Sequence, residues 1–573
     1  MEIRKPTILV ISASFIFFTY YYTYRDTNYK MNMDYGVSVV KFNRKKPIYI
    51  YNDTEDFLIN TPGCYIPNYG KTLVFKESKN YNKTCGERAV FVQRTGNEQV
   101  VFRIDAKILK KYSKSKEVQC SYMFARRSNL TGEEDARLSY TEKKPFKSGT
   151  NITLEEEVIT VVCETSLNKK GSSSRSIVYE DAYVFVKKIS KKKPTSNDIR
   201  LNVLMVGMDT MSRARLLSSM PKTHKYFQKH GWLDYKAYHK VGSNTFPNLI
   251  AFMTGKKLGT MYKKCNLGMH KCNDLIIWSR FRKTGYTTAY GEDNLRLPDT
   301  FFKQKGFQTV PTDHYMRPFF LTGETQNGNL ICAKHKPSAS HILDYAHEFA
   351  NMYKNDHFFG IFWMNSYSHN TDNSPKLLDN DMVSFFEKLN SSDIMNNTII
   401  IFLSDHGIRF GDMRIHTMES YYEERLPMLF IWTPNEFKKL HAVKYDNMKL
   451  NQNRLVTPYD LYETLTELTN TPKVSDVETD ACPNCTSLFE EKSAYRTCAD
   501  AGISDKWCSC HNMTNVDNLK DIGANTSLQL AVEHLQNITN LVKTNDCTAC
   551  HSLYLDTVLR TYSYEADKKT HYV

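Results

Sequence analysis

Two patterns of hydrophobic positions divide most of the chain. Between about residues 40 and 190, short runs of valine, isoleucine and aromatic residues are separated by polar turns, which predicts a β-rich region. From about residue 199 the pattern changes, and short wholly apolar runs alternate with helical segments. Wholly apolar runs of strand length are typical of strands buried on both faces. This second part therefore predicts an α/β domain with a largely parallel sheet.

The apolar runs also locate a candidate site. The clearest predicted strands are residues 202–207, 358–364, 398–403 and 428–432, and helical patterns cover residues 212–230 and 459–468. Parallel sheets bind ligands beyond the carboxyl ends of their strands, so the polar residues that follow these runs are expected to converge on one edge. These residues are Asp209, Asn365, Ser366, Ser404, Asp405 and His406.

The amino-terminal pattern predicts a membrane anchor. Arg4 and Lys5 precede an uncharged apolar stretch over residues 7–24, which ends in a tyrosine cluster. The flanking positive charges predict that residues 1–6 are cytoplasmic, which makes the chain a single-pass type II membrane protein of the secretory pathway or cell surface. The stretch is short for a span, so a cleaved signal peptide and secretion to the extracellular space are the alternative.

These patterns predict three luminal parts after the anchor. They are a β-rich accessory region at 25–195, an α/β domain at 196–475 and a cysteine-rich region at 476–573. The 14 cysteines are expected to be paired mostly as disulfides in an oxidising compartment, with the connectivity left open. The pairs Cys482-x-x-Cys485 and Cys547-x-x-Cys550 could instead form a zinc ribbon, but zinc binding needs reduced thiols, which export disfavours.

Asn-x-Ser/Thr sequons predict a glycosylated luminal chain. Their asparagines are Asn52, Asn82, Asn129, Asn151, Asn390, Asn396, Asn484, Asn512, Asn525 and Asn537. The formal net charge of +14 is compatible with an anionic partner, but the basic residues are spread along the chain. The densest basic run, residues 187–193, contains no aromatic residue and is expected to be a solvated linker, so no nucleic-acid partner is expected. The oligomeric state is left open.

Three short segments carry the candidate chemistry. Asp209 ends VGMD, Thr245 lies in SNTFPN, and Asp405 and His406 lie in LSDHG. Carboxylate oxygens and imidazole nitrogens are suited to Zn²⁺ or Mn²⁺. Pro247 and the apolar run after it predict that Thr245 begins a helix, whose first N–H groups would face an anion. A bound metal would lower the pKa of the Thr245 hydroxyl and so make it a nucleophile.

The segments resemble the alkaline phosphatase superfamily, which includes sulfatases, nucleotide pyrophosphatases/phosphodiesterases and phosphoethanolamine transferases. NTFPN is similar to the pyrophosphatase nucleophile segment, and SDHG is similar to the shared metal-binding motif. The run from about residue 201 to residue 510 more closely resembles an animal family called DUF229, through MVGMDTMSR, TFPNLIAFMTG, PTDHYMRPF, FWMNSYSHN, SDHGIRFG, EERLP and AGISDKWCSC. The resemblance implies an alkaline phosphatase-like three-layer α/β/α core.

The resemblance also implies roles for individual residues. Asp209, Asp405 and His406 match the ligands of one divalent metal, with zinc preferred and manganese or calcium as alternatives. Thr245 matches the nucleophile. Two-metal members hold a second ion with an Asp-x-x-x-His segment and a later histidine. In this chain the matching residues are Asn365, His369 and His416.

The amide of Asn365 coordinates more weakly than a carboxylate and brings no charge, so one metal is favoured over two. These three residues are predicted to form a weakened second metal site or to bind substrate. Asp313, His314 and Arg317 in PTDHYMRPF either bind substrate or form a packed, hydrogen-bonded turn. Glu423 and Glu424 of EERLP are expected to cap a helix or pair with Arg425.

The nucleophile position decides between ester classes. Sulfatases use a Cys-x-Pro-x-Arg segment, and Thr245 stands where that cysteine would be. Cleavage at phosphorus is therefore predicted, by a phosphohydrolase, phosphodiesterase or phosphotransferase acting on an anionic phosphate ester of a glycan, lipid or nucleotide. The alternative is a catalytically inactive extracellular glycoprotein that keeps the fold as a binding module.

Overall fold

The computed structural model describes most of the chain beyond residue 55. The described residues are 56–71, 73, 75, 84–86, 89–104, 106–113, 118–169, 172–191, 201–265, 272–297, 306–369, 374–411, 413–414, 417–469, 481–511, 513–517, 520–541, 553–558, 560–566 and 569–572. The predicted cytoplasmic tail and anchor, residues 1–24, lie outside them. Within these ranges no helix has the length and apolar character needed to span a bilayer. The chain divides into two compact units, Asn68–Trp507 and the joined segments Met1–Pro67 and Cys508–Val573.

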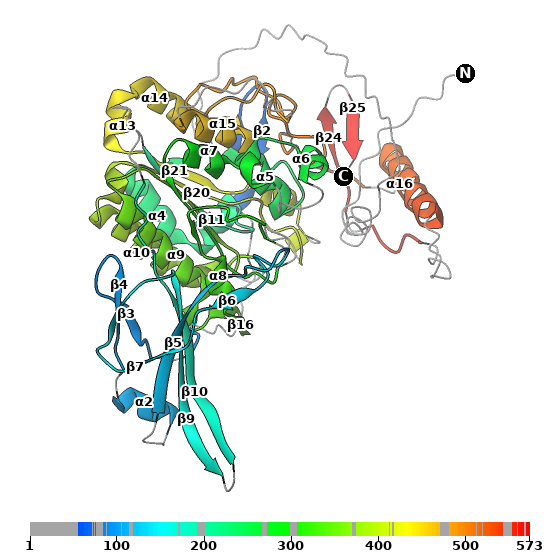
Figure 1. Cartoon of the computed structure of the whole chain (residues 1–573). Helices are drawn as coiled ribbons and strands as arrows, with labels where there is room; N and C mark the ends of the chain where they lie inside the picture. The colour runs from blue at the N-terminus through cyan, green and yellow to red at the C-terminus, as the bar shows by residue number, and fades with distance from the viewer. Residues whose placement is uncertain are drawn as a thin grey trace. The chain divides into compact units, whose positions relative to one another are not determined.

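A seven-stranded sheet forms the centre of the larger unit (Figure 1). Its order is β12 (Leu233–Asp234), β21 (Leu429–Trp432), β20 (Thr398–Leu403), β11 (Asn202–Met208), β19 (Phe358–Met364), β14 (Thr287–Glu292) and β15 (His314–Tyr315). The five strands from β20 to β15 are parallel, whereas β21 is antiparallel to β20. The four predicted strands are all present, with ends within one residue of those expected, and the prediction of a largely parallel sheet is confirmed.

Helices cover both faces of this sheet. The side chains of β11 are therefore buried alternately in two separate cores. Val203 and Met205 belong to one core, and Leu204 and Val206 belong to the other. The first core is closed by α5 (Thr245–Thr254), α6 (Leu258–Cys265), α7 (Ile277–Lys283), α13 (Asn435–Leu440), α14 (Ala442–Asn451) and α15 (Pro458–Leu468). The second is closed by α3 (Arg213–Ser219), α4 (Pro221–His230), α8 (Arg317–Leu321), α9 (Ser338–Tyr353) and α10 (Pro375–Ser391). The predicted three-layer α/β/α arrangement is confirmed.

The helical pattern over residues 212–230 forms two helices rather than one. Helix α3 ends at Ser219 and α4 starts at Pro221, which is the first residue of that helix. Proline has no backbone N–H, so it cannot continue the hydrogen bonds of α3, but it is favoured in the first turn of α4.

The predicted β-rich region has its own sheets and its own core. One sheet has the order β10-β9-β5-β6 with β7 on β5, and another has the order β3-β4-β8. The strands are β3 (Val92–Arg94), β4 (Gln99–Phe102), β5 (Val118–Arg127), β6 (Leu138–Tyr140), β7 (Lys144–Phe146), β8 (Asn151–Thr153), β9 (Val158–Lys169) and β10 (Ser172–Val184). Their core contains Phe91, Phe102, Phe124 and Val161.

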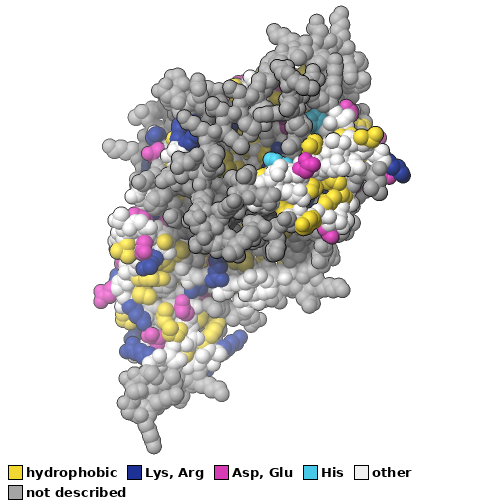
Figure 2. Space-filling model, turned by 90° about the vertical axis from the view of Figure 1, so that its right-hand side faces the viewer, with side chains coloured by type: hydrophobic (Ala, Val, Ile, Leu, Met, Phe, Trp, Pro, Cys, Tyr) yellow, Lys and Arg dark blue, Asp and Glu magenta, His cyan; other side chains and the backbone are white. Residues whose placement is uncertain are grey.

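On the face drawn in Figure 2, acidic and basic side chains of the described residues are interspersed.

The predicted linker at 187–193 is partly anchored rather than fully solvated. Lys191 donates hydrogen bonds from its Nζ to Asp313 Oδ2 at 2.6 Å and to the Tyr286 carbonyl at 2.9 Å. A lysine with two such acceptors is fixed at the surface of the α/β domain, which the basic pattern of the sequence did not predict.

The smaller unit contains β1 (Phe57–Asn60), β2 (Tyr65–Pro67), β23 (Thr514–Asn515), α16 (Ile522–Leu541), β24 (Tyr562–Ala566) and β25 (Lys569–Tyr572). Strands β1 and β2 form an antiparallel pair, and β23, β24 and β25 form a three-stranded sheet. The disulfide Cys64–Cys510 links the first of these segments to the second.

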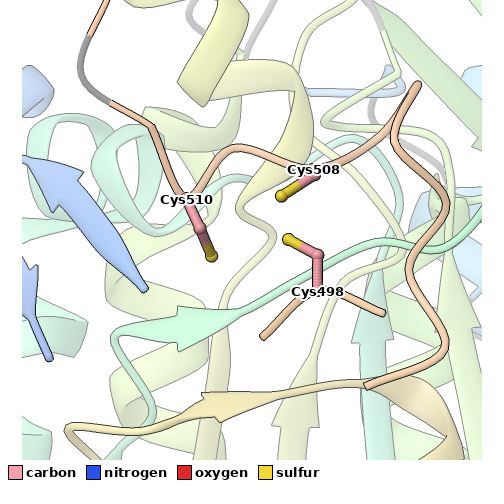
Figure 3. A group of neighbouring side chains, drawn as sticks. All are labelled: Cys498, Cys508 and Cys510. Atoms are coloured by element: carbon pink, nitrogen blue, oxygen red, sulfur yellow. The ribbon is translucent and has the colours of Figure 1, made fainter. Parts of the chain in front are cut away.

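The described cysteines are disulfide-bonded, as predicted for an exported chain. The pairs are Cys64–Cys510, Cys85–Cys332, Cys120–Cys163, Cys265–Cys272 and Cys482–Cys485, and Cys498 and Cys508 are also disulfide-bonded. Figure 3 shows Cys498, Cys508 and Cys510, none of which has a thiolate to offer a metal. The bond between Cys482 and Cys485 excludes a zinc ribbon at that pair. Cys547 and Cys550 lie outside the described residues.

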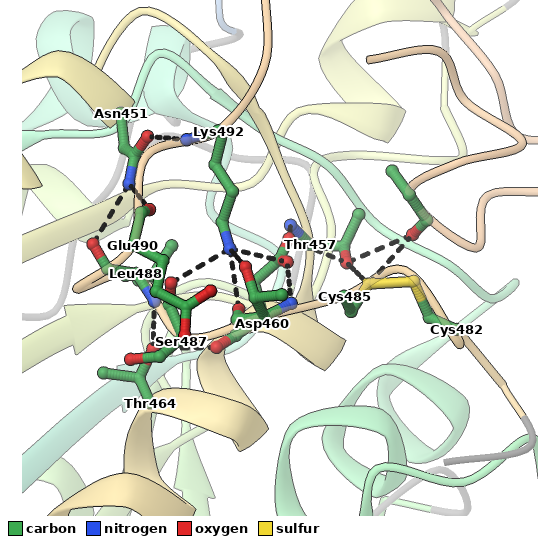
Figure 4. Close-up of polar contacts among 12 residues, drawn as sticks. Asn451, Thr457, Asp460, Thr464, Cys482, Cys485, Ser487, Leu488, Glu490 and Lys492 are labelled. Atoms are coloured by element: carbon green, nitrogen blue, oxygen red, sulfur yellow. Dashed lines mark hydrogen bonds and ion pairs between the residues drawn. A yellow bond between two sulfur atoms is a disulfide. The ribbon is translucent and has the colours of Figure 1, made fainter. Parts of the chain in front are cut away.

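A buried polar network holds residues 481–507 against α15 (Figure 4). Asp460 of α15 accepts two hydrogen bonds from Arg496, at 2.8 and 3.0 Å, and its Oδ1 lies 3.3 Å from Lys492 Nζ. Cys482 and Cys485 pack with Ala251 of α5 in a small apolar core. The start of the predicted cysteine-rich region therefore supports the helix that begins at Thr245.

Candidate metal centre

Two neighbouring strands bring the predicted metal ligands together. Asp209 follows β11, and Asp405 and His406 follow β20. The two strands are parallel with Gly207 beside Leu403, so their carboxyl ends are level. One ligand atom from each of the three residues lies within 4.8 Å of the others, and all three residues are buried.

The three residues fit a divalent cation. Asp405 Oδ2 and His406 Nε2 are 3.2 Å apart, and neither of these buried atoms has a hydrogen-bond partner among the described residues. Buried polar atoms are normally satisfied, so two such atoms facing one another suit a shared cation. His406 Nδ1 lies 2.8 Å from the Gly407 carbonyl, to which it can donate its hydrogen, and this leaves the Nε2 lone pair for a metal. Two carboxylates and an imidazole suit Zn²⁺ or Mn²⁺.

The protonation states agree with ligand roles. Burial, together with nearby Arg409 and Lys240, lowers the pKa of His406 to about 4 against the opposing effect of Asp405, so the imidazole is neutral at pH 7. Burial and the charge of Asp405 raise the pKa of Asp209. Two carboxylates buried side by side repel one another, and a cation between them would remove this repulsion.

A strained residue connects the two carboxylates. Thr210 has a φ of 57°, which is uncommon for a residue with a β-branched side chain. Its N–H donates to Asp405 Oδ1 at 3.0 Å, and its hydroxyl donates to Asp209 Oδ1 at 2.9 Å. Arg215, which is fully buried, donates from Nη1 to the carbonyls of Thr210 and Ser368. This backbone conformation lets Thr210 orient both carboxylates. No pattern in the sequence predicted the conformation.

The predicted nucleophile lies beside these ligands. Helix α5 begins at Thr245, as expected, and the Thr245 hydroxyl donates to Asp209 Oδ1 at 3.3 Å. The Asn248 side chain accepts the N–H groups of Val241 and Gly242 at 2.8 and 2.9 Å. Asn248 therefore fixes the loop that leads into α5, and with it the position of Thr245.

A protein-family model matches most of the chain. The model of a family described as "Protein of unknown function (DUF229)" matches residues 78–559. The chain belongs to the DUF229 family. A comparison with curated protein sequences gives no match.

Solved structures similar to this DUF229 chain include three bacterial proteins. A protein of the alkaline phosphatase superfamily from Vibrio parahaemolyticus has 13% identity and a TM-score of 0.37, over 67% of this chain and 81% of that one. The lipooligosaccharide phosphoethanolamine transferase A of Neisseria meningitidis has 13% identity and a TM-score of 0.37, over 52% and 60%. The lipoteichoic acid synthase LtaP of Listeria monocytogenes has 13% identity and a TM-score of 0.34, over 57% and 81%.

The possible second-site residues of the DUF229 chain are arranged differently from the first three ligands. His369 Nε2 lies 4.0 Å from Asp209 Oδ2, so His369 is at the edge of the first centre. Asn365 donates from Nδ2 to the Asp293 carbonyl at 2.7 Å and to Glu292 Oε1 at 3.3 Å. The Asn365 amide nitrogen is thus engaged with the end of β14. His416 lies outside the described residues.

The motif PTDHYMRPF binds the accessory region instead of lying beside Asp209. Asp313 accepts the Thr288 N–H at 2.8 Å, near the start of β14 and so at the amino end of the parallel strands. The ligands of the DUF229 centre follow the opposite, carboxyl ends. Asp313 also accepts a hydrogen bond from Lys191, and His314 is hydrogen-bonded to Glu157 and Tyr353. Arg317 donates to the Asp135 carbonyl. Of the two readings of this motif, these contacts favour the packed, hydrogen-bonded turn.

Two basic residues of the DUF229 site had not been expected. Arg409 and Lys240 both act electrostatically on His406, and Arg409 also acts on Asp209. The position of Arg409 in SDHGIRFG, three residues after His406, is a sequence signal that could have found it. Lys240 comes from the loop before α5, and its proximity depends on the fold. Gly407 is required by packing, because a Cβ there would lie 1.8 Å from the Glu423 carbonyl oxygen.

Proposed function

We infer that this DUF229 protein is a metal-dependent enzyme that transfers or hydrolyses a phosphoryl group, with Thr245 as the nucleophile. The observation that carries this proposal is the pair of unsatisfied buried atoms, Asp405 Oδ2 and His406 Nε2, next to Asp209 and within reach of Thr245. Zinc is the preferred ion, held by Asp209, Asp405 and His406 at a single site. A divalent ion bound there supplies positive charge that lowers the pKa of the Thr245 hydroxyl and neutralises charge on the phosphoryl group.

The residues of the chain have separate tasks in this reaction. The Thr245 oxygen attacks phosphorus and displaces the ester oxygen, and water or a second hydroxyl then takes the phosphoryl group from Thr245. The first N–H groups of α5 favour an anion at the helix start. Arg409 adds a positive charge beside the ligands. Thr210 and Asn248 orient the carboxylates and Thr245.

We place the enzyme in the secretory pathway or at the cell surface, held by the predicted anchor at residues 7–24. Disulfides throughout the described cysteines support an oxidising compartment. An anionic phosphate ester of a glycan, lipid or nucleotide is the proposed substrate. The engagement of the Asn365 amide by Glu292 and Asp293 supports one metal rather than two.

The test measures bound metal and ester hydrolysis in the same samples. The full chain is expressed in a secretory host, and metal per chain is measured by mass spectrometry in wild type, Asp405→Asn and Thr245→Ala. Hydrolysis of p-nitrophenyl phosphate and bis(p-nitrophenyl) phosphate is followed in parallel. Near-stoichiometric zinc or manganese that is lost in Asp405→Asn, and turnover that falls at least about 10³-fold in Thr245→Ala, are expected.

Matched controls separate chemistry from folding. Thr254→Ala removes a buried threonine at the other end of α5, whose hydroxyl donates to the Ile250 carbonyl. Asp313→Asn neutralises a carboxylate outside the centre. Both are expected to retain metal and turnover. A folded chain that binds no zinc or manganese would contradict the proposed enzymatic function. The alternative, a catalytically inactive binding module, would then remain.

A further inference from the structure

Three basic side chains surround one carboxylate beside the metal centre. Lys240 Nζ donates to Glu424 Oε1 at 2.6 Å. Arg414 Nη2 and Arg425 Nη1 each lie 3.4 Å from Glu424 Oε2. Although burial raises the pKa of Glu424, Lys240 and the two arginines hold that pKa well below its usual value, so Glu424 is ionised. Burial lowers the pKa of Lys240 to about 7, whereas Arg414, Arg425 and the nearby Lys506 bring three positive charges against the one carboxylate of Glu424. We call Lys240, Arg414, Glu424, Arg425 and Lys506 the basic cluster.

The Trp507 ring lies beside two of these basic side chains, Lys240 and Arg425, and beside a further lysine, Lys506. The Trp507 ring centroid lies 4.1 Å from Lys240 Nζ, 4.9 Å from Lys506 Nζ and 5.7 Å from Arg425 Cζ. Lys506 is exposed and Trp507 is partly exposed, and the Arg414 side chain is 20% exposed. The basic cluster therefore runs from a fully buried lysine to groups that solvent and solutes reach.

Backbone contacts place this cluster directly beside the ligand His406. The Gly407 N–H donates to the Glu424 carbonyl at 3.1 Å, and the Lys240 N–H donates to the Arg425 carbonyl at 3.0 Å. Since Gly407 follows His406, the backbone of Glu424 is hydrogen-bonded to the residue next to this ligand. A group bound at the cluster would be close enough to belong to the same substrate molecule.

We propose that the basic cluster is a subsite for a second anionic group of the substrate, a sulfate, phosphate or carboxylate separate from the ester group at the centre. This inference rests on the proposed function and narrows it to polyanionic esters. Arginine forks pair with such anions through two parallel hydrogen bonds, and cations next to a reacting centre raise the local concentration of an anionic substrate. Arg414 and Lys506 are the residues with the access needed to contact the anion.

Calorimetric titration of the full chain tests the subsite directly. The probes are sucrose octasulfate, myo-inositol hexakisphosphate and hexaglutamate, with neutral sucrose as the uncharged comparison, and the tightest probe identifies the anion. Arg414→Ala and Lys506→Ala are each expected to weaken binding about fivefold to tenfold, as for the loss of one charged contact. Lys439→Ala, which removes an exposed lysine of α13, is the control and should bind like wild type.

Two further outcomes separate this inference from the proposed function. Probe binding that survives Asp405→Asn but weakens in Arg414→Ala belongs to the cluster and supports the inference. Binding that Arg414→Ala and Lys506→Ala leave unchanged, or that Lys439→Ala weakens equally, overturns it even if the chain hydrolyses esters. A chain that binds the probes through the cluster but hydrolyses no ester and holds no metal would instead overturn the proposed function.

Discussion

At the scale of single residues, Thr210 shows how strain serves the centre. It occupies the left-handed region of backbone space while its N–H and hydroxyl hold Asp405 and Asp209. A conformation that costs about 1–3 kcal/mol persists when the surroundings fix it, and Arg215 does so through the Thr210 carbonyl.

Replacement of Thr210 should therefore weaken metal binding more than folding. Thr210→Ala removes the hydroxyl bond to Asp209, and we expect the affinity for zinc to fall about tenfold to 100-fold, as for other residues that orient metal ligands. Competition against a chromogenic chelator measures this affinity. Thr210→Ser keeps the hydroxyl and is the control. Equal zinc affinity in wild type and Thr210→Ala would show that the hydroxyl does not orient Asp209.

At the scale of elements, buried ion pairs join α15 to residues 481–507. Asp460 faces Arg496 and Lys492 in the interior. Although burial raises the pKa of Asp460, Arg496 and Lys492 outweigh this effect and hold the pKa below its usual value. A carboxyl with a depressed pKa in the folded state stabilises the fold above its unfolded pKa of about 3.9. This contribution is lost as the pH falls through the lower, folded pKa.

Neutralising Asp460 should reveal that contribution. Asp460→Asn leaves two cations buried without their carboxylate, and we expect the free energy of unfolding to fall by about 3–5 kcal/mol at pH 7. The loss should shrink as the pH falls below about 4, because the unfolded wild-type carboxyl then binds a proton that the folded carboxyl, with its lower pKa, does not bind. Urea unfolding at pH 7 and pH 3 measures both effects. Asp505→Asn, at an exposed position, is the control, and a loss that is the same at both pH values would contradict the argument.

At the scale of the whole molecule, one loop of the accessory region is built into the α/β domain. Asp135 is buried and accepts the Phe307 N–H at 2.6 Å and the Tyr315 hydroxyl at 2.8 Å. The Asp135 carbonyl accepts from Arg317 Nε at 2.7 Å. The two regions share these buried hydrogen bonds, so they should unfold together.

Asp135→Ala tests this coupling. It leaves the Phe307 N–H and the Tyr315 hydroxyl without their acceptor, and we expect a loss of about 3–5 kcal/mol in a single unfolding transition. Denaturant unfolding followed by both far-UV and near-UV circular dichroism measures it. Glu133→Ala, two residues earlier, should cost less than about 0.5 kcal/mol. Two separate transitions in the wild type would mean that the regions are independent.

The sequons make a second prediction at this scale. Each sequon asparagine in the described ranges is exposed, namely Asn129, Asn151, Asn390, Asn396, Asn484, Asn525 and Asn537. Glycosylation needs such exposure and a secretory lumen. We expect a peptide N-glycosidase to lower the mass of the chain expressed in a secretory host, and Asn→Gln changes to remove glycans individually. A chain that enters the host's secretory pathway and yet carries no glycan would contradict the prediction.

The sequence predicted the central strands well because burial on both faces leaves a wholly apolar run. Residues 358–364 and 398–403 form β19 and β20 with the expected bounds. Strands β12 and β15 contain two residues each, which is too short for any hydrophobic period, so they appeared only in the structure. The break between α3 and α4 was signalled by Pro221 but not predicted.

For the candidate site, the sequence identified the main residues, and the structure showed how distant segments position them. Strand ends and short polar motifs were enough to select Asp209, Thr245, Asp405 and His406, because the carboxyl ends of parallel strands meet at one edge. Sequence could not decide that PTDHYMRPF binds the accessory region, that Thr210 joins the carboxylates through a left-handed backbone, or that Lys240 reaches Glu424 from 184 residues away. These features depend on contacts between distant segments, which local patterns do not encode, and so only the packing of the strands and helices determined them.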